Sequence, residues 1–168
     1  ARSGAFDSVV ALAEAIGAPV YREGLRAQLS FPSRHPSNRG RVPFAAKDTA
    51  KVLGEHDLVL LLGGPFFEDI WHDTISPFAP GAKIIQIENN DQQLAFNFPL
   101  DLGIIGDIRG VVSDLVATLS LGDKSFRDGV QSRNTTLSKE HDLKVHRFRA
   151  DLEKVWDHEP MAPLRALH

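Results

Sequence analysis

The chain has 168 residues, of which 42% are hydrophobic and 24% are charged, a balance typical of one soluble folded domain. It contains no cysteine, which excludes disulfide scaffolds, thiolate metal sites and thiol catalysis. The formal net charge of −3 does not suggest a nucleic-acid surface. No apolar run is long enough for a membrane span and no signal-peptide pattern occurs, so we expect a cytoplasmic protein.

The first elements are predicted from apolar spacing and turn residues. A helix with Gly17 at its C-cap is expected at the start, because apolar residues recur there every three or four positions: Phe6, Val9, Val10, Ala13 and Ile16. A short strand over 18–21 follows. Residues 29–43 are rich in Pro, Ser, Asn and Gly and are predicted to be irregular. A second helix is expected over 44–53.

Three later segments are predicted to be strands. Residues 57–62 contain five consecutive apolar residues, a pattern typical of a parallel strand that is buried on both faces. Residues 83–87 and 102–105 are the other two strands. Asp107 is the expected N-cap of the next helix, which carries one apolar stripe: Ile108, Val111, Val112, Leu115 and Leu119.

Strands that alternate with helices predict an α/β fold, an open parallel sheet with helices on both faces. Such a domain ordinarily opens with a strand, whereas this sequence opens with a helix. We therefore expect the first strand to be missing and the sequence to be cut at both ends. Residues 122–137 are polar and are interpreted as a linker, followed by a last helix over 138–156.

Candidate sites are expected where parallel strands end, because loops and helix N-termini meet there. Gly63 and Gly64 follow the first long strand and are either a phosphate-binding turn or a simple strand exit. Glu88 follows the next strand, where the stretch 88–91 is either a ribose-binding site or a turn in which Asn90 or Asp91 simply caps the following helix. Asp107 is explained by capping alone.

The histidines offer one candidate acid or base. His72 lies in the loop after the 57–62 strand, where it is either a proton-transfer group or a solvated surface residue. His35 lies in a turn-rich loop and is interpreted as structural. No metal-binding pattern of His, Asp and Glu is present, so no metal site is predicted.

Several motifs occur in a characteristic order: F-P-S-R-H-P-S-N-R-G over 31–40, the strand and glycine turn of 57–64, A-P-G-A-K-I-I-Q-I over 79–87, and G-D at 106–107. In this order they resemble the central domain of thiamine-diphosphate-dependent enzymes, the family of acetolactate synthase, pyruvate oxidase and benzoylformate decarboxylase. The F-P-x-R-H-P-x-x-R-G stretch and the L-G-x-P-x-F turn are most similar to benzoylformate decarboxylase. The resemblance covers roughly residues 3–120.

This resemblance implies a Rossmann-like central domain over 1–121, an interdomain linker with a helix over 122–160, and the start of a cofactor-binding domain over 161–168. It also implies a parent enzyme, a homodimer or homotetramer, whose flanking pyrimidine- and diphosphate-binding domains hold thiamine diphosphate and Mg²⁺. In the family these domains supply a glutamate and a G-D-G…N motif, neither of which can be placed here. We therefore expect no bound cofactor and no catalysis by this chain alone.

The resemblance also bears on the individual site residues. In benzoylformate decarboxylase the central domain lends an active-site histidine from the loop after the L-G-x-P-x-F turn, and an ungapped match places Ile70 there, with His72 two residues later. His72 is thus the candidate catalytic residue, acting only in the parent enzyme. Relatives that bind FAD or ADP carry an arginine in this turn. Here it is absent, and Glu68 and Asp69 would repel a pyrophosphate, so FAD is not expected.

The sequence therefore predicts the scaffold domain of a thiamine-diphosphate-dependent 2-oxo-acid decarboxylase or carboligase. One alternative is a free-standing FAD- or ADP-binding module of the same fold, with Gly63, Gly64, Glu88 and Asp107 as its site. Another is an interaction domain that self-associates through open sheet edges. Neither nucleic acid nor a membrane is an expected partner.

Overall fold

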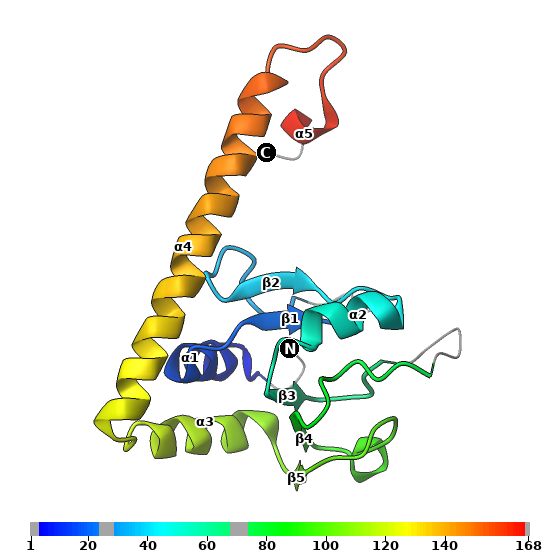
Figure 1. Ribbon diagram of the computed structural model, residues 1–168, viewed down its shortest axis with the longest axis vertical. Coiled ribbons are helices and arrows are strands. Elements are labelled where there is room, and N and C mark those ends of the chain that lie inside the picture. The colour runs from blue at the N-terminus through cyan, green and yellow to red at the C-terminus, as the bar shows by residue number, and fades with distance from the viewer. Residues whose placement is uncertain (1–3, 24–28, 68–73, 167–168) are drawn as a thin grey trace.

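The strands of the computed structural model, which describes residues 4–23, 29–67 and 74–166, form two parallel sheets (Figure 1). In the first sheet, β1 (Val20–Arg22) pairs with β2 (Asn38–Arg41). In the second, β4 (Lys83–Glu88) lies between β3 (Leu58–Leu62) and β5 (Leu102–Ile105). The segments predicted as strands at 18–21, 57–62, 83–87 and 102–105 are confirmed to within two residues at each end.

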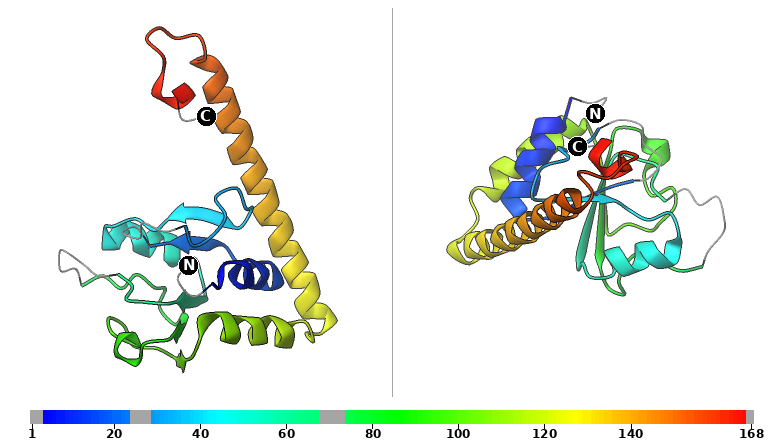
Figure 2. Two further views of the ribbon diagram at one scale, coloured as in Figure 1. Left: turned by 180° about the vertical axis from the view of Figure 1, so that it is seen from behind. Right: turned by 90° about the horizontal axis from the view of Figure 1, so that it is seen from above.

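Helices lie on both sides of the strands. α1 (Phe6–Ile16) and α3 (Ile108–Leu119) pack together on one side, and α2 (Ala46–Leu53) lies on the other, as the right-hand view of Figure 2 shows. A short 3-10 helix, η1 (Asp91–Gln93), follows β4. The chain ends with α4 (Lys124–Lys154) and α5 (Pro163–Ala166). The predicted α/β fold is confirmed.

The main core lies between the three-stranded sheet and the α1–α3 pair. Its centre is formed by Leu12 of α1, Ile87 of β4 and Val112 of α3, all of which are buried. Gly17 ends α1 in the left-handed conformation (φ 60°), and the Asp107 side chain accepts a hydrogen bond from the Gly110 backbone N–H at the start of α3. Both predicted caps are confirmed, and they fix where these two helices begin and end.

β2 lies in the segment that was predicted to be irregular, so that prediction is wrong over 38–41. Its sequence, N-R-G-R, has neither alternation nor β-branched residues, and only pairing with β1 makes it a strand. The side chain of the buried Asn38 orders the backbone around β2: its Nδ2 donates to the Pro32 carbonyl, and its Oδ1 accepts from the Gly40 N–H.

The predicted start of the last helix at 138 is wrong: α4 begins at Lys124 and runs without interruption to Lys154, so most of the segment interpreted as a linker is helical. Asp123 caps it by accepting a hydrogen bond from the Phe126 N–H. The segment is polar because α4 is held to α1 by hydrogen bonds rather than by an apolar stripe. The proposed division of the chain at 121 and 160 stays a prediction.

β3 is less buried than its apolar sequence predicts. Only Leu61 is buried, and Leu58 is 48% exposed. The reason is that β3 pairs with β4 on one side and with no described strand on the other. β1 likewise has one unpaired side, and the Tyr21 and His56 rings, 5.9 Å apart, connect β1 to the residues just before β3. Among the described residues β1 and β3 do not pair, so the two sheets are separate.

Among the helices of the described ranges, none combines the length and apolar character that a membrane span requires.

Candidate functional site

The turns after β3, β4 and β5 meet at one edge of the three-stranded sheet. The Gly63 N–H donates to the Ile87 carbonyl (2.9 Å), and the Gly106 N–H donates to the Glu88 carbonyl (2.9 Å). These bonds extend the ladders by one residue past each strand. The structure therefore brings together the predicted residues Gly63, Gly64 and Glu88, with Asp107 beside them at the start of α3.

Glu88 is the buried charged group of this edge, with 2% of its surface exposed. Its Oε1 accepts hydrogen bonds from the backbone N–H groups of Asn89 (2.9 Å) and Asn90 (3.2 Å). Its Oε2 is buried and has no hydrogen-bond partner among the described residues. Since a buried carboxylate oxygen without a donor is costly, Oε2 is a vacant acceptor for a hydroxyl or N–H group.

Gly64 is a glycine because Glu88 lies against it. A Cβ at this position would stand 2.9 Å from Glu88 Oε2 and 3.1 Å from Gln86 Nε2. The turn after β3 therefore approaches the two polar side chains of β4 closely. This packing concerns Gly64, whereas Gly63 has a left-handed backbone (φ 83°) that favours glycine.

The other two predicted polar positions have local roles. Asp107 Oδ2 accepts from the Gly110 N–H at 2.9 Å, so helix capping accounts for it. Asn90 accepts from the Gln92 N–H and caps η1.

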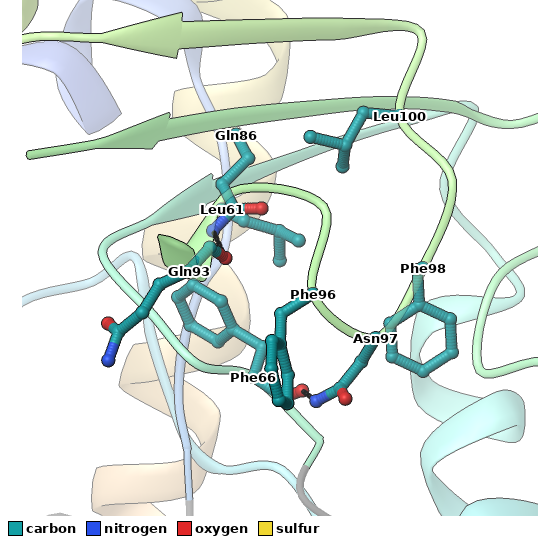
Figure 3. Close-up of a pocket in the computed structure, with 8 residues that line it drawn as sticks. All are labelled: Leu61, Phe66, Gln86, Gln93, Phe96, Asn97, Phe98 and Leu100. Carbon is teal, nitrogen blue, oxygen red and sulfur yellow. Dashed lines mark hydrogen bonds between the residues drawn. The ribbon is translucent and has the colours of Figure 1, made fainter. Parts of the chain in front are cut away.

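A shallow aromatic pocket lies beside this edge, on the opposite face from the α1–α3 core (Figure 3). It is a shallow hollow that opens to solvent, with room for about one water molecule. The lining residues come from β3, β4 and the turns that follow them: Leu61, Phe66, Gln86, Gln93, Phe96, Asn97, Phe98 and Leu100. Phe96 is 67% exposed, so the pocket presents an aromatic surface outward.

The buried side chain of Gln86 holds the loop after β4, which lines this pocket. It is 4% exposed; its Nε2 donates to the Gln93 carbonyl (3.1 Å) and its Oε1 accepts from the Ala95 N–H (3.1 Å). The Asn97 Nδ2 donates to the Phe66 carbonyl and joins the post-β4 loop to the post-β3 turn. The two turns are therefore one hydrogen-bonded unit.

Three phenylalanines pack edge to face below the post-β3 turn. The ring centroids of Phe67, Phe78 and Phe98 lie 5.3–5.8 Å apart. Phe67 has a φ of 55°, a left-handed conformation that a bulky residue rarely adopts. The aromatic contacts offset this strain and hold together residues 67 and 78, which flank the segment that carries His72.

Sequence reasoning missed the pocket and its buried glutamine. Two signals were available: five of the ten phenylalanines lie between residues 66 and 98, and Gln86 interrupts an otherwise apolar strand. A buried polar residue in a strand must find a partner, which indicates an ordered loop next to it.

Of the two histidines considered in the sequence analysis, His72 and His35, the structure describes only His35. His72, together with Ile70, Glu68 and Asp69, lies outside the described residues. His35 has a partner on each ring nitrogen: Nδ1 accepts from the Ser37 N–H (3.1 Å), and Nε2 lies 3.3 Å from Glu14 Oε1. His35 is therefore structural.

The described residues do not fit a thiamine diphosphate–magnesium centre. No group of three His, Asp or Glu side chains lies close enough together within residues 4–23, 29–67 and 74–166 to hold a metal ion.

Comparison with known proteins assigns the domain. Residues 1–115 match the family model of the thiamine pyrophosphate enzyme central domain. The chain belongs to this family. As a central domain, it is 33% identical over 120 residues to acetolactate synthase of Mycobacterium bovis, covering 70% of this chain and 19% of the relative.

Two further relatives of this central domain are decarboxylases. Benzoylformate decarboxylase of Pseudomonas aeruginosa is 31% identical over 105 residues, which cover 59% of this chain and 19% of the relative. The structure of the thiamine diphosphate-dependent 4-hydroxybenzoylformate decarboxylase of Rhodococcus jostii superposes with a TM-score of 0.64 at 28% identity, covering 73% of this chain and 23% of that one. The central domain thus spans about a quarter or less of the proteins that it matches.

Proposed function

We propose that this chain serves as the central, scaffolding domain of a thiamine-diphosphate-dependent 2-oxo-acid decarboxylase or carboligase. The observation that carries the proposal is the match of residues 1–115 to the central-domain family, whose matched relatives are four or more times longer than the matched segment. In such a parent enzyme the flanking domains bind thiamine diphosphate and Mg²⁺, and the cofactor supplies the carbanion chemistry. This chain supplies none of that chemistry by itself.

The structure supports a scaffolding role for the aromatic side of the domain. Gln86, Asn97 and the Phe67–Phe78–Phe98 cluster hold the ends of the post-β3 and post-β4 loops in one place. Residues at the carboxyl ends of parallel strands are where α/β domains present groups to a ligand. We propose that His72, in the segment between Phe67 and Phe78, faces the substrate of the parent enzyme.

The test begins with the open reading frame around this sequence. A G-D-G…N stretch downstream and a glutamate upstream are expected, and the protein made from the whole frame should bind thiamine diphosphate with Mg²⁺ in calorimetry and consume pyruvate or benzoylformate. The 168-residue chain should do neither. A full-frame protein that bound no thiamine diphosphate would overturn the proposal.

His72→Ala in the full-frame protein separates the site prediction from the family assignment. We expect a lower kcat with thiamine diphosphate binding unchanged. His158→Ala, at an exposed position just after α4, is the control and should keep the parent kcat. If both variants have the parent kcat, the role of His72 is refuted while the domain assignment stands.

Glu88 favours a second candidate function, the nucleotide-binding module. Its buried, unpartnered Oε2 beside Gly64 is suited to accept a hydroxyl hydrogen bond, as a ribose provides. Calorimetric titration of the 168-residue chain with ADP and with FAD tests this candidate. Binding that is lost in Glu88→Gln would support it, and absence of heat with both nucleotides at millimolar concentration would exclude it.

A further inference from the structure

The C-terminal end of α1, which Gly17 caps locally, is also bound by a different helix. The last turn of α1 contains no basic residue, and its exposed carbonyl groups carry the negative end of the helix dipole. α4 supplies further donors: Arg133 donates from Nε (3.1 Å) and Nη2 (2.9 Å) to the Ile16 carbonyl. Asn134 Nδ2 donates to the Glu14 carbonyl at 2.9 Å. A guanidinium and an amide from α4 thus add to the local cap, in which the Gly17 and Ala18 N–H groups donate to the Glu14 and Ala13 carbonyls.

The contact between α1 and α4 is close as well as polar. A Cβ on Gly17 would lie 2.9 Å from both Arg133 Cβ and the Val130 carbonyl oxygen, so the backbones approach to the limit that a glycine permits. One turn farther along the same face of α4, Leu137 is only 7% exposed. After another turn, Glu140 forms an ion pair with Arg39 of β2. The spacing of three or four residues places all these contacts on one face of α4.

Beyond Glu140 the helix leaves the body of the molecule. Figure 1 and the left-hand view of Figure 2 show the second half of α4 projecting past β2 with α5 at its far end. Residues 141–154 extend it by about 20 Å at the usual rise of an α-helix. This part is polar on most sides, as in helices that bridge domains through solvent.

The far end of α4 carries its own fixed contact. The Arg165 guanidinium lies 4.8 Å from the centroid of the Trp156 ring, and its Nη1 donates to the Trp156 carbonyl at 2.7 Å. Leu152 is 5% exposed although it lies on the projecting half. Arg165 of α5 is therefore held to Trp156, two residues past the end of α4.

We propose that α4 is a rigid arm and that Arg133 and Asn134 form the clamp that sets its direction. The projecting half, residues 141–154, is short enough to be marginal as an isolated helix, so the anchored first half must stabilise and orient it. The clamp thereby fixes the distance between the sheets and α5. A segment attached beyond α5 would be held in a defined orientation instead of on a flexible tether.

The absence of cysteine allows a direct test with two introduced spin labels. Asp114→Cys on α3 and Lys144→Cys on the projecting half of α4 are both exposed sites. Pulsed electron–electron double resonance measures the distance between the two labels, and on the labelled 168-residue chain it should give a single narrow distance distribution. Adding Arg133→Ala and Asn134→Ala should broaden the distribution and shift its mean. Lys139→Ala, an exposed basic residue on the same helix, is the matched control and should change neither.

Two results would overturn the proposal. A broad distribution in the parent chain would show that α4 is a tether, and a narrow distribution retained without the clamp would show that other contacts set its direction. Should the double variant lose its helical circular dichroism, Arg133→Lys replaces it. This substitution keeps the charge but removes the two-nitrogen contact with Ile16, and it should broaden the distribution.

Discussion

The close packing of Glu88 against Gly64 leaves little room for a larger residue at position 64. Because a Cβ on Gly64 would stand 2.9 Å from Glu88 Oε2, Gly64→Ala should destabilise the domain by about 1–3 kcal/mol, the usual cost of overpacking. Urea unfolding measures the change. Gly110→Ala is the control: its Cβ would meet only Asp107 Oδ2 at 3.6 Å, and in a helix it should be neutral or stabilising by about 1 kcal/mol. Equal stability of the two variants would contradict the steric explanation.

Replacing Gly17 by a larger residue should carry both a conformational and a steric cost. Gly4 and Gly17 both have left-handed backbones (φ 64° and 60°), but a Cβ on Gly4 would meet nothing within 4 Å, whereas on Gly17 it would meet α4. Gly4→Ala should therefore lose about 1–2 kcal/mol from strain alone, and Gly17→Ala should lose more. Chemical denaturation of both variants gives the difference, which measures the closeness of α1 and α4. No difference would mean that the helices separate at little cost.

At the scale of elements, Asp101 joins the start of β5 to β4. Its Oδ1 accepts from Lys83 Nζ (2.6 Å) and its Oδ2 from the Ile84 N–H (2.9 Å), while its own N–H donates to the Ile84 carbonyl. The hydrogen bond from Lys83, followed by that from the Ile84 N–H, lowers the pKa of the Asp101 carboxyl below its ordinary 3.8.

This lowered pKa predicts a specific acid sensitivity. A carboxyl with a depressed pKa in the folded state stabilises the fold above its unfolded-state pKa, and the contribution is lost as the pH falls from about 4 through the folded-state pKa. Asp101→Asn should therefore lose less stability on acidification over that window than the parent chain. Melting temperature against pH checks this, with Asp114→Asn on α3 as the control that keeps the parent slope. Parallel slopes for all three would refute the role of Asp101.

At the scale of the whole molecule, the lack of pairing between β1 and β3 leaves a row of backbone groups without strand partners among the described residues. In a parallel ladder, alternate N–H groups point to opposite sides; Gly63 donates to β4, so Leu60 and Leu62 point to the open side. Their amides should exchange with solvent faster than that of Leu61 in residue-resolved hydrogen exchange by NMR. Equal protection would mean that another segment covers this edge.

The helices, their caps and the apolar strands could be predicted from the sequence because each depends on residues that are close together in the chain. The apolar spacing of α1 and α3, the caps at Gly17 and Asp107 and the continuous apolar strands all depend on neighbours within a few residues. The α/β fold follows from them, and the ordered motifs over 31–40, 57–64 and 79–87 indicated the family. Gly63, Gly64 and Glu88 were placed together correctly because parallel strands end at a common edge.

Tertiary contacts decided the rest. β2 is a strand only because it lies beside β1. Residues 124–137, whose composition suggested a linker, are helical, and Arg133 and Asn134 in this segment form hydrogen bonds with the end of α1. The vacant oxygen of Glu88 and the order of the aromatic pocket depend on Gly64, Gln86 and Asn97 meeting across two turns. Local sequence encodes periodicity and caps, whereas the pairing of polar groups that are distant along the chain is settled only when the packed elements bring donors and acceptors within bonding distance.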